Sequence, residues 1–322
     1  SAASDVYKRQ VKAHRKERPG WPQPRRTIAE YTDFPRDILV DDMDGVRIIT
    51  IRRPQAANSL SAYSCDEIKA ELKKGEADPS IKGFIITGYG TRAFCAGADI
   101  NGFIATIDNY SAGMALSRGN SEVIEYINTM SKPVVAGVNG LAMGGGVELA
   151  TACHSIVADK GVFFQLPELT LGIFPGMGGA ALPYRKWPQA AEKFHAMIGR
   201  NERLTCKEAD ELGIISRVTS GYKEMIQAGT DEVNRLVDNV PRATDGPVSI
   251  PEFTVPDKPM AGDLPLSREA LEIVGKAINQ GAAAESFKAA MEITYHYSGV
   301  ISLSLIHISE PTRRTIPSRM PS

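Results

Sequence analysis

Short apolar runs alternate with helical patterns through the middle of the chain, and this alternation constrains the fold more than any other feature. Residues 46–51, 83–87 and 133–138 are β-branched and apolar, as expected of buried strands. Patterns with helical spacing follow the first two runs at residues 61–75 and 117–129. We therefore predict an α/β fold built around a mostly buried sheet.

The same alternation continues toward the C-terminus. Glycines at 144–146 follow the third apolar run and predict the start of a helix that extends through Ala152. Short strands are expected at 155–158 and 162–164, and a helix at 189–198. Thr205 and Glu208 have the spacing of a helix capping box, with Gly213 as the stop signal. A proline-rich interval then leads to one helical pattern over 267–297, which predicts a helical C-terminal region.

Composition narrows the class of protein. The chain has 322 residues, 43% of them hydrophobic, and a formal net charge of -1, so no basic face for nucleic acid is indicated. No apolar run has the length needed to cross a bilayer, so we expect no membrane association. The cysteines are scattered without CxxC spacing, which favours a reduced, cytoplasmic protein with no metal site; they are Cys65, Cys95, Cys153 and Cys206.

Both ends of the chain look unlike protein-coding sequence. Residues 5–10 can be encoded by a short DNA element whose reverse complement encodes residues 303–308, and this element resembles a transposase-end sequencing adapter. We therefore expect residues 1–10 and 303–322 to be adapter-like artefacts and the natural reading frame to be interrupted at both ends. Residues 11–40 are expected to form an extension or linker, 41–235 the core, and 236–302 a truncated helical region.

Three segments combine glycines with carboxylates in a way that suggests chemistry. They are residues 92–100, 139–149 and 164–179. Glycine lets main-chain amides approach a ligand closely, although glycine clusters more often serve turns and packing. Glu148 and Glu168 fall in the second and third segments, and paired carboxylates suit general acid–base catalysis.

In this order and spacing, the three segments resemble those of the crotonase (enoyl-CoA hydratase/isomerase) superfamily, over about residues 46–218 with a weaker similarity to 299. The resemblance implies a spiral of repeated ββα units. It implies that the amides of Ala98 and Gly145 form an oxyanion hole for a thioester carbonyl. Glutamates at both catalytic positions, here Glu148 and Glu168, are typical of the hydratases in the family.

The resemblance also implies which residues contact the substrate. Residues 53–58 resemble the family segment that wraps coenzyme A, with Gln55 where a lysine is common. Residues 101–117 would line the acyl pocket, with Ile104 and Met114 as expected contacts. The full set of expected substrate-binding residues is Ala56, Ala57, Arg92, Ala96, Asp99, Ile100, Gly144 and Gly176.

The function implied is an enoyl-CoA hydratase of fatty acid β-oxidation that adds water across the 2,3 double bond of a 2-enoyl-CoA. Coenzyme A would be part of the substrate, with no separate cofactor. An enoyl-CoA isomerase or another crotonase-type acyl-CoA enzyme is an alternative, and so is a non-catalytic acyl-CoA-binding fragment. The family resemblance further implies a homotrimer or hexamer, and it allows fusion to a 3-hydroxyacyl-CoA dehydrogenase domain.

Overall fold

The structure is a computed structural model that describes residues 36–99, 103 and 106–309. The adapter-like residues 1–10 and most of the expected extension lie outside the described residues, as do residues 310–322. Residues 303–309, also part of the adapter-like segment, continue the last helix of the chain.

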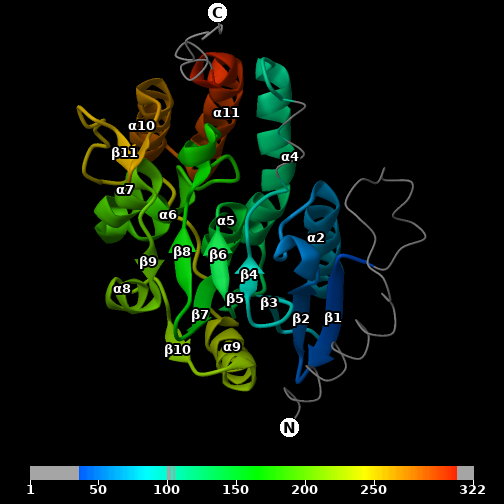
Figure 1. Cartoon of the computed structure of the whole chain (residues 1–322). Helices are drawn as coiled ribbons and strands as arrows, with labels where there is room; N and C mark the ends of the chain where they lie inside the picture. The colour runs from blue at the N-terminus through cyan, green and yellow to red at the C-terminus, as the bar shows by residue number, and fades with distance from the viewer. Residues whose placement is uncertain (1–35, 100–102, 104–105, 310–322) are drawn as a thin grey trace, which may run out of the picture.

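Two sheets share the strands of the core (Figure 1). The larger sheet has the order β1-β2-β3-β5-β7-β10 and the smaller has the order β4-β6-β8-β9. The strands of the larger sheet are β1 (Ile38–Met43), β2 (Val46–Ile51), β3 (Gly83–Gly88), β5 (Val134–Val138), β7 (Ser155–Asp159) and β10 (Arg217–Thr219). Those of the smaller sheet are β4 (Ala93–Cys95), β6 (Leu141–Met143), β8 (Phe163–Gln165) and β9 (Leu204–Thr205).

From β3 to β8, consecutive strands alternate between the sheets, which produces a spiral of ββα units. β3 lies in the larger sheet and β4 in the smaller, before helix α4 (Tyr110–Thr129); β5, β6 and α5 (Gly145–Ala152) repeat the pattern. Pairing is parallel from β2 through β3, β5, β7 and β10 in one sheet and from β4 through β6 to β8 in the other. The predicted α/β fold with a crotonase-like spiral is confirmed.

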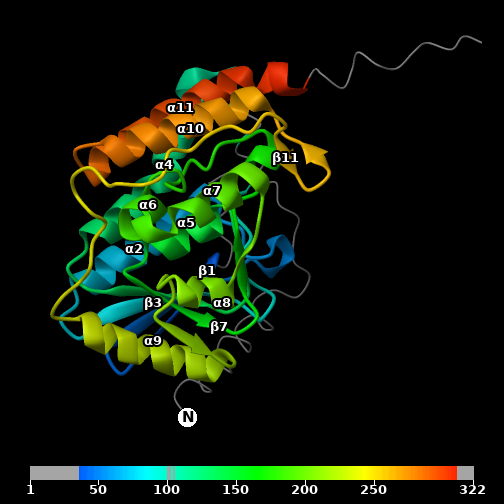
Figure 2. The same cartoon turned by 90° about the vertical axis from the view of Figure 1, so that its left-hand side faces the viewer.

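Helices cover the larger sheet on both sides (Figure 2). Helix α9 (Tyr222–Leu236) packs Met225, Ile226 and Val233 against Ile85 and Val135 on the outer face. The main core lies on the inner face, under α2 (Ala62–Glu76), α4 and α5. The remaining helical elements are η2 (Pro54–Ala56), η3 (Glu168–Leu171), α6 (Leu182–Lys186), η4 (Pro188–Ala190), α7 (Ala191–Arg200) and α8 (Cys206–Glu211).

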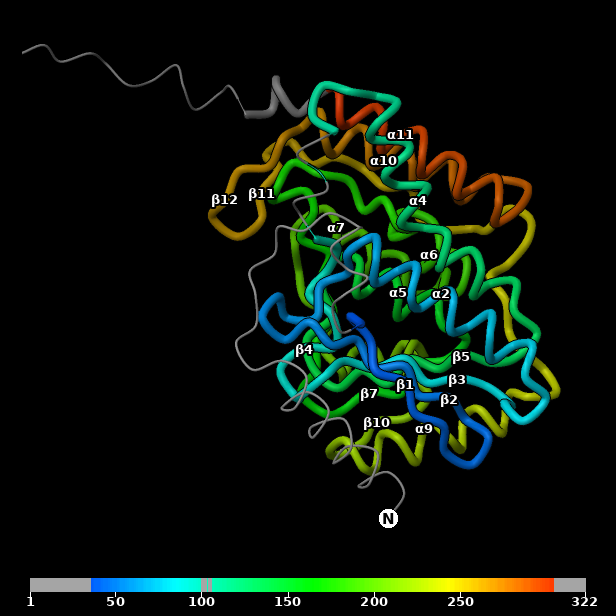
Figure 3. Tube along the Cα trace, turned by 90° about the vertical axis from the view of Figure 1, so that its right-hand side faces the viewer, coloured from blue at the N-terminus to red at the C-terminus, as the bar shows by residue number. Residues whose placement is uncertain are grey.

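Two antiparallel helices form an outer layer above the core. They are α10 (Arg268–Ala283) and α11 (Phe287–Ser309), and α11 lies alongside α4 (Figures 2 and 3). A small hairpin of β11 (Met260–Ala261) and β12 (Leu264–Pro265) precedes them. The structure thus confirms a helical C-terminal region, but the single helix expected over 267–297 is interrupted near Ala284, where the backbone becomes extended.

Other expectations need correction at their boundaries. Strand β1 begins at Ile38, inside the expected 11–40 extension, and pairs with β2 across the Asp44-Gly45 turn. Helix α4 begins at Tyr110 rather than near residue 117, because Asn109 caps it by accepting from the amide of Ala112. The capping box of Thr205 and Glu208 is present at the start of α8, as predicted.

Candidate active site

Two glycine-containing segments meet where α5 begins. Gly97, after β4, has φ +106°, and Gly144, just before α5, has φ +50° and ψ -124°. Such angles favour glycine, because a Cβ would clash with the neighbouring backbone. A Cβ added to Gly145 would lie 3.0 Å from the amide nitrogen of Ala98, so the two segments are in direct contact.

The amides of Ala98 and Gly145 are available to a ligand. Gly145 is the first residue of α5, where an amide has no partner inside the helix. Within the described part of the chain, neither amide donates a hydrogen bond to a protein acceptor. The positive end of the helix dipole adds to the field at Gly145. The pair can therefore bind an oxygen atom that carries developing negative charge.

Glu148 lies in the first turn of α5 with its carboxylate held by two amides. Its side chain is buried, and Oε1 accepts hydrogen bonds from the amides of Met177, at 2.8 Å, and Gly179, at 2.7 Å. Burial raises the pKa of Glu148 to about 7, and the two amide hydrogen bonds oppose that rise. Glu148 can therefore exchange a proton near neutral pH.

Glu168, at the start of η3, has fewer hydrogen-bond donors around its carboxylate. Its side chain is buried, and Oε2 has no hydrogen-bond partner among the described residues. Burial, and then the charge of Glu148, raise the pKa of Glu168 well above its usual range. A Cβ on Gly144 would lie 2.9 Å from Oε1 of Glu168, so this glycine leaves room for the carboxylate. At neutral pH, Glu168 should hold a proton more firmly than Glu148.

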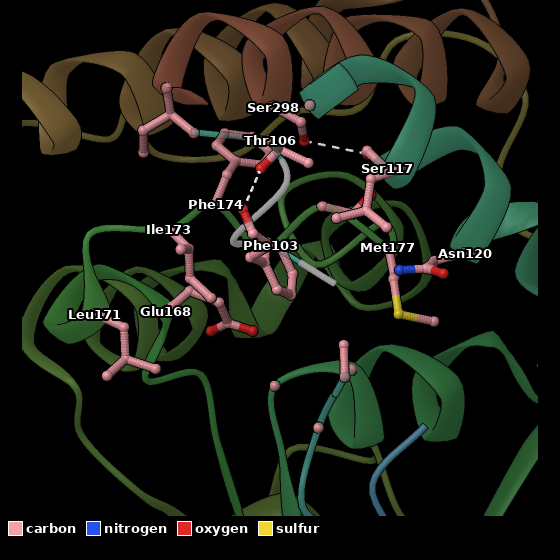
Figure 4. Close-up of a pocket in the computed structure, with 18 of the residues that line it drawn as sticks. Phe103, Thr106, Ser117, Asn120, Glu168, Leu171, Ile173, Phe174, Met177 and Ser298 are labelled. Atoms are coloured by element: carbon pink, nitrogen blue, oxygen red, sulfur yellow. Dashed lines mark hydrogen bonds between the residues drawn. The ribbon is translucent and has the colours of Figure 1, made fainter. Parts of the chain in front are cut away.

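Both glutamates, together with Ala98 and Gly145, line one mostly apolar cavity. Figure 4 shows this cavity. The cavity has about 780 Å³ of empty space including its open mouth, within the usual range for a small-molecule site. The carboxylate of Glu168 points into it. The larger apolar side chains that line the cavity are those of Phe103, Leu116, Leu171, Ile173, Phe174, Met177 and Ile301.

Known proteins share this arrangement of sequence and fold. Residues 41–245 match the family model described as enoyl-CoA hydratase/isomerase. The chain belongs to the enoyl-CoA hydratase/isomerase family. It is 33% identical over 249 residues to a probable enoyl-CoA hydratase of Bacillus subtilis, covering 77% of this chain and 92% of the relative.

Two further comparisons agree with this family assignment. A crotonyl-CoA hydratase of Syntrophomonas wolfei is 36% identical over 185 residues, covering 56% of this chain and 68% of the relative. A solved enoyl-CoA hydratase subunit from Geobacillus kaustophilus superposes with a TM-score of 0.56 at 26% identity, covering 86% of this chain and 92% of that structure.

The structure brings most of the expected site residues together around the cavity. The cavity is lined by both glutamates and by Ala96, Ala98, Gly144, Gly145 and Gly176. Five residues of the expected acyl-pocket segment also line it: Phe103, Thr106, Gly113, Leu116 and Ser117. Met114 packs against the core instead of lining the cavity. Ile100 and Ile104 lie outside the described residues.

Four expected substrate-binding residues do not line the cavity: Ala56, Ala57, Arg92 and Asp99. The carbonyl of Ala57 accepts a hydrogen bond from the amide of Ala96 at 3.0 Å. Asp99 forms an ion pair with the buried Arg53 at 3.0 Å. These two contacts connect the segment around η2 with the segment that contains Ala98. The side chain of Arg92 is exposed at the surface.

The sequence did not reveal every group at the site. The amides of Met177 and Gly179 hold Glu148, although only Gly176 was singled out in that turn. Ser298, Ile301 and Ser302 line the cavity from α11, about 150 residues after Glu148 in the chain. The glycine-rich composition of residues 176–179 was the available signal for the first pair. We find no comparable sequence signal for the cavity-lining residues of α11.

The described residues give two further results. None of their helices combines the length and apolar character that a membrane span requires. Within the same residues, no cluster of histidine, cysteine and acidic side chains is arranged to hold a metal ion.

Proposed function

We propose that this protein adds water across the 2,3 double bond of a 2-enoyl-CoA thioester. The observation that carries the proposal is the pair of buried carboxylates with opposite environments beside two free main-chain amides. Family membership and relatives named as hydratases support the same reaction.

In the proposed mechanism, the amides of Ala98 and Gly145 hold the thioester oxygen. Ionised Glu148 takes a proton from water as the water oxygen bonds to C3 of the substrate. The electrons of the double bond move toward the thioester oxygen, where the two amides stabilise the enolate. Protonated Glu168 then gives its proton to C2, and the thioester carbonyl forms again. Return of a proton from Glu148 to Glu168 restores the enzyme.

The environments of the two carboxyl groups support this division of roles. Two amide donors stabilise the ionised form of Glu148, whereas Oε2 of Glu168 has no donor among the described residues. Because the groups interact, their titration belongs to the pair. The pair would then carry one proton at neutral pH, which is the state that hydration requires.

The remaining substrate contacts are part of the proposal. The segment of Ala56 and Ala57 would lie against coenzyme A, and exposed Arg92 would reach a phosphate group. The apolar cavity would hold the acyl chain, with no separate cofactor. We also infer a homotrimer or hexamer acting in β-oxidation in the cytoplasm, and the family allows fusion to a 3-hydroxyacyl-CoA dehydrogenase domain; the resemblance to the family supports these points.

Crotonyl-CoA tests the proposed reaction directly. We expect the absorbance of the conjugated thioester to fall as 3-hydroxybutyryl-CoA forms, and Glu148→Gln to slow this at least about a hundredfold. Free thiol and a 3-enoyl-CoA substrate should be followed in parallel. Release of thiol, or isomerisation of the 3-enoyl-CoA without hydration, would assign another reaction of the family. Binding without any turnover would indicate an acyl-CoA-binding fragment.

A further inference from the structure

One peptide group beside the candidate site is hydrogen-bonded at both ends. The amide of Met177 donates to Oε1 of Glu148 at 2.8 Å. The carbonyl of the same peptide, which belongs to Gly176, accepts from the hydroxyl of Ser117 at 2.5 Å. The hydroxyl of Ser121 lies 3.2 Å from this carbonyl but 2.8 Å from the carbonyl of Ser117, to which its single proton is mainly donated. Because the peptide is trans, its C=O and N–H point in opposite directions. Whatever holds the carbonyl therefore aims the amide at Glu148.

A third serine extends the chain of hydrogen bonds to the outer helical layer. The hydroxyl of Ser298, on α11, donates to Oγ of Ser117, on α4, at 3.1 Å. Figure 4 shows these two side chains turned toward each other across the helix interface. The donors run in one sense, from Ser298 through Ser117 to the carbonyl of Gly176. Such a chain polarises each bond in it.

The surroundings leave little freedom to the three groups. Ser117, Ser121 and Ser298 are all buried. A Cβ on Gly176 would lie 2.8 Å from Oγ of Ser298 and 3.1 Å from Oγ of Ser117. The glycine thus provides the space that the hydroxyls of Ser117 and Ser298 occupy, and Ser117 reaches its carbonyl. This gives Gly176 a role beyond the substrate contact that was expected of it.

We propose that Ser117 and Ser298 are positioning residues, which orient and polarise the Gly176–Met177 peptide so that its amide holds the carboxylate of Glu148. The inference rests on the proposed function, because it assigns the serines to the base of that reaction. A more polarised peptide is a better donor to an ionised carboxylate. Loss of either hydroxyl should therefore favour the protonated form of Glu148.

Neighbouring titratable groups also act on Glu148. Among the described residues, the carboxyl of Glu168, on η3, and the buried thiol of Cys95, on β4, interact with it electrostatically. The residues of α4 and α11 in this network are uncharged serines. A change in a serine should therefore alter the titration of Glu148 without removing a charge from its surroundings.

The test measures the titration of Glu148 in Ser117→Ala and Ser298→Ala. An infrared difference titration against Glu148→Gln isolates this carboxyl group and needs no activity. We expect its pKa to rise by about half a unit in Ser117→Ala and by less in Ser298→Ala. The acid limb of the pH profile for kcat should move by the same amount. In Ser117→Thr, which keeps a hydroxyl group, both the pKa of Glu148 and the acid limb should stay close to their wild-type values.

A matched control distinguishes positioning from a general effect on α11. Thr294 is also buried on α11, and its hydroxyl bonds to the carbonyl of Ala290 without touching the serine chain. Thr294→Val should leave the titration of Glu148 unchanged. An unchanged pKa in both serine variants would overturn the proposal, and so would an equal rise in Thr294→Val. If the wild type fails to hydrate crotonyl-CoA, the proposed function fails while the titration still decides this inference.

Discussion

The two buried glutamates make folding stability depend on pH. A carboxyl group whose pKa is higher in the folded state binds protons more tightly there than in the unfolded chain. For Glu148, whose pKa rises from 4.5 to about 7, the free energy of unfolding should fall as pH increases between these values. The full effect is on the order of 3 kcal/mol. The site is thus maintained at the expense of stability at neutral pH.

Glu168→Gln should separate activity from stability. The amide cannot donate an acidic proton to C2, so the hydration rate should fall at least about a hundredfold. It also carries no charge to be buried, so the variant should be about 1 kcal/mol more stable than wild type at pH 8. Urea unfolding at pH 8 and pH 4.5 measures this. A stability difference that is the same at both pH values would contradict the explanation.

At the residue scale, the sequence located the carboxylates better than their partners. Glu148 and Glu168 could be assigned because each lies in a segment with a recognisable pattern. The amides of Met177 and Gly179 could not, since a donor is defined by the path of the turn through space. The partner of Asp99 could not be predicted either, since its ion pair with Arg53 joins residues 46 positions apart in the chain.

At the scale of elements, two glycines of α4 have opposite surroundings. A Cβ on Gly113 would lie 2.2 Å from Oγ of Ser302 and 2.9 Å from the carbonyl of Ser298, both on α11. Gly119, on the same helix, is exposed, and a Cβ there would meet no atom within 4 Å. The first glycine permits close packing of α4 on α11, while the second only weakens the helix.

These surroundings predict opposite effects of the same substitution. Gly119→Ala should stabilise the protein by up to about 1 kcal/mol through helix propensity. Gly113→Ala should destabilise it by about 1–3 kcal/mol, because the backbone of α11 must move away. Thermal unfolding of both variants provides the measurement. Stabilisation by both substitutions would show that α4 and α11 are not packed as described.

The elements that sequence patterns missed have physical explanations. β1 contains Asp41 and Asp42 and forms an edge of the larger sheet, so it lacks the continuous apolar run of a central strand. Gly113 and Gly119 obscured the first half of α4. The break between α10 and α11 has no proline or glycine; instead, the hydroxyl of Ser286 accepts from the amide of Ala289 at the start of α11.

At the scale of the whole molecule, one arginine joins the outer helical layer to the core. The guanidinium of Arg185, on α6, is buried and donates to four carbonyls. Two belong to the segment after α9, at Thr244 and Gly246, and two to the end of α10, at Gly281 and Ala284. Burial lowers the pKa of Arg185, but the five-donor fork still satisfies four acceptors in one place.

Replacing this arginine should loosen the C-terminal layer. Arg185→Met leaves four carbonyls without their donor, which should cost about 3 kcal/mol or more. Arg268→Met is the matched control, because exposed Arg268 also donates to two carbonyls, those of Pro256 and Asp257. Its loss should cost less than about 1 kcal/mol. Urea unfolding, with limited proteolysis of residues 237–266, compares the two; equal costs would contradict the role of Arg185.

The general architecture was predictable because it follows from local patterns. Apolar runs separated by helical patterns predict an α/β fold with a buried sheet, whereas the ββα spiral was implied by the resemblance of the glycine-containing segments to the crotonase superfamily. The docking of α10 and α11 over the cavity was not predictable to the same degree. It depends on Arg185 and on close packing against α4, and these contacts link residues far apart in the chain.

The main-chain amides at the start of α5 have a consequence for how such an enzyme can change. A carbonyl held by the amides of Ala98 and Gly145 would depend on main-chain N–H groups, which every residue except proline carries. The side chains of Glu148 and Glu168, by contrast, are each one nucleotide substitution from glutamine or aspartate. If these residues act as proposed, substitution of a glutamate would alter proton transfer and leave the contact with the thioester oxygen in place, so descendants of this scaffold could acquire a new reaction without first losing their substrate.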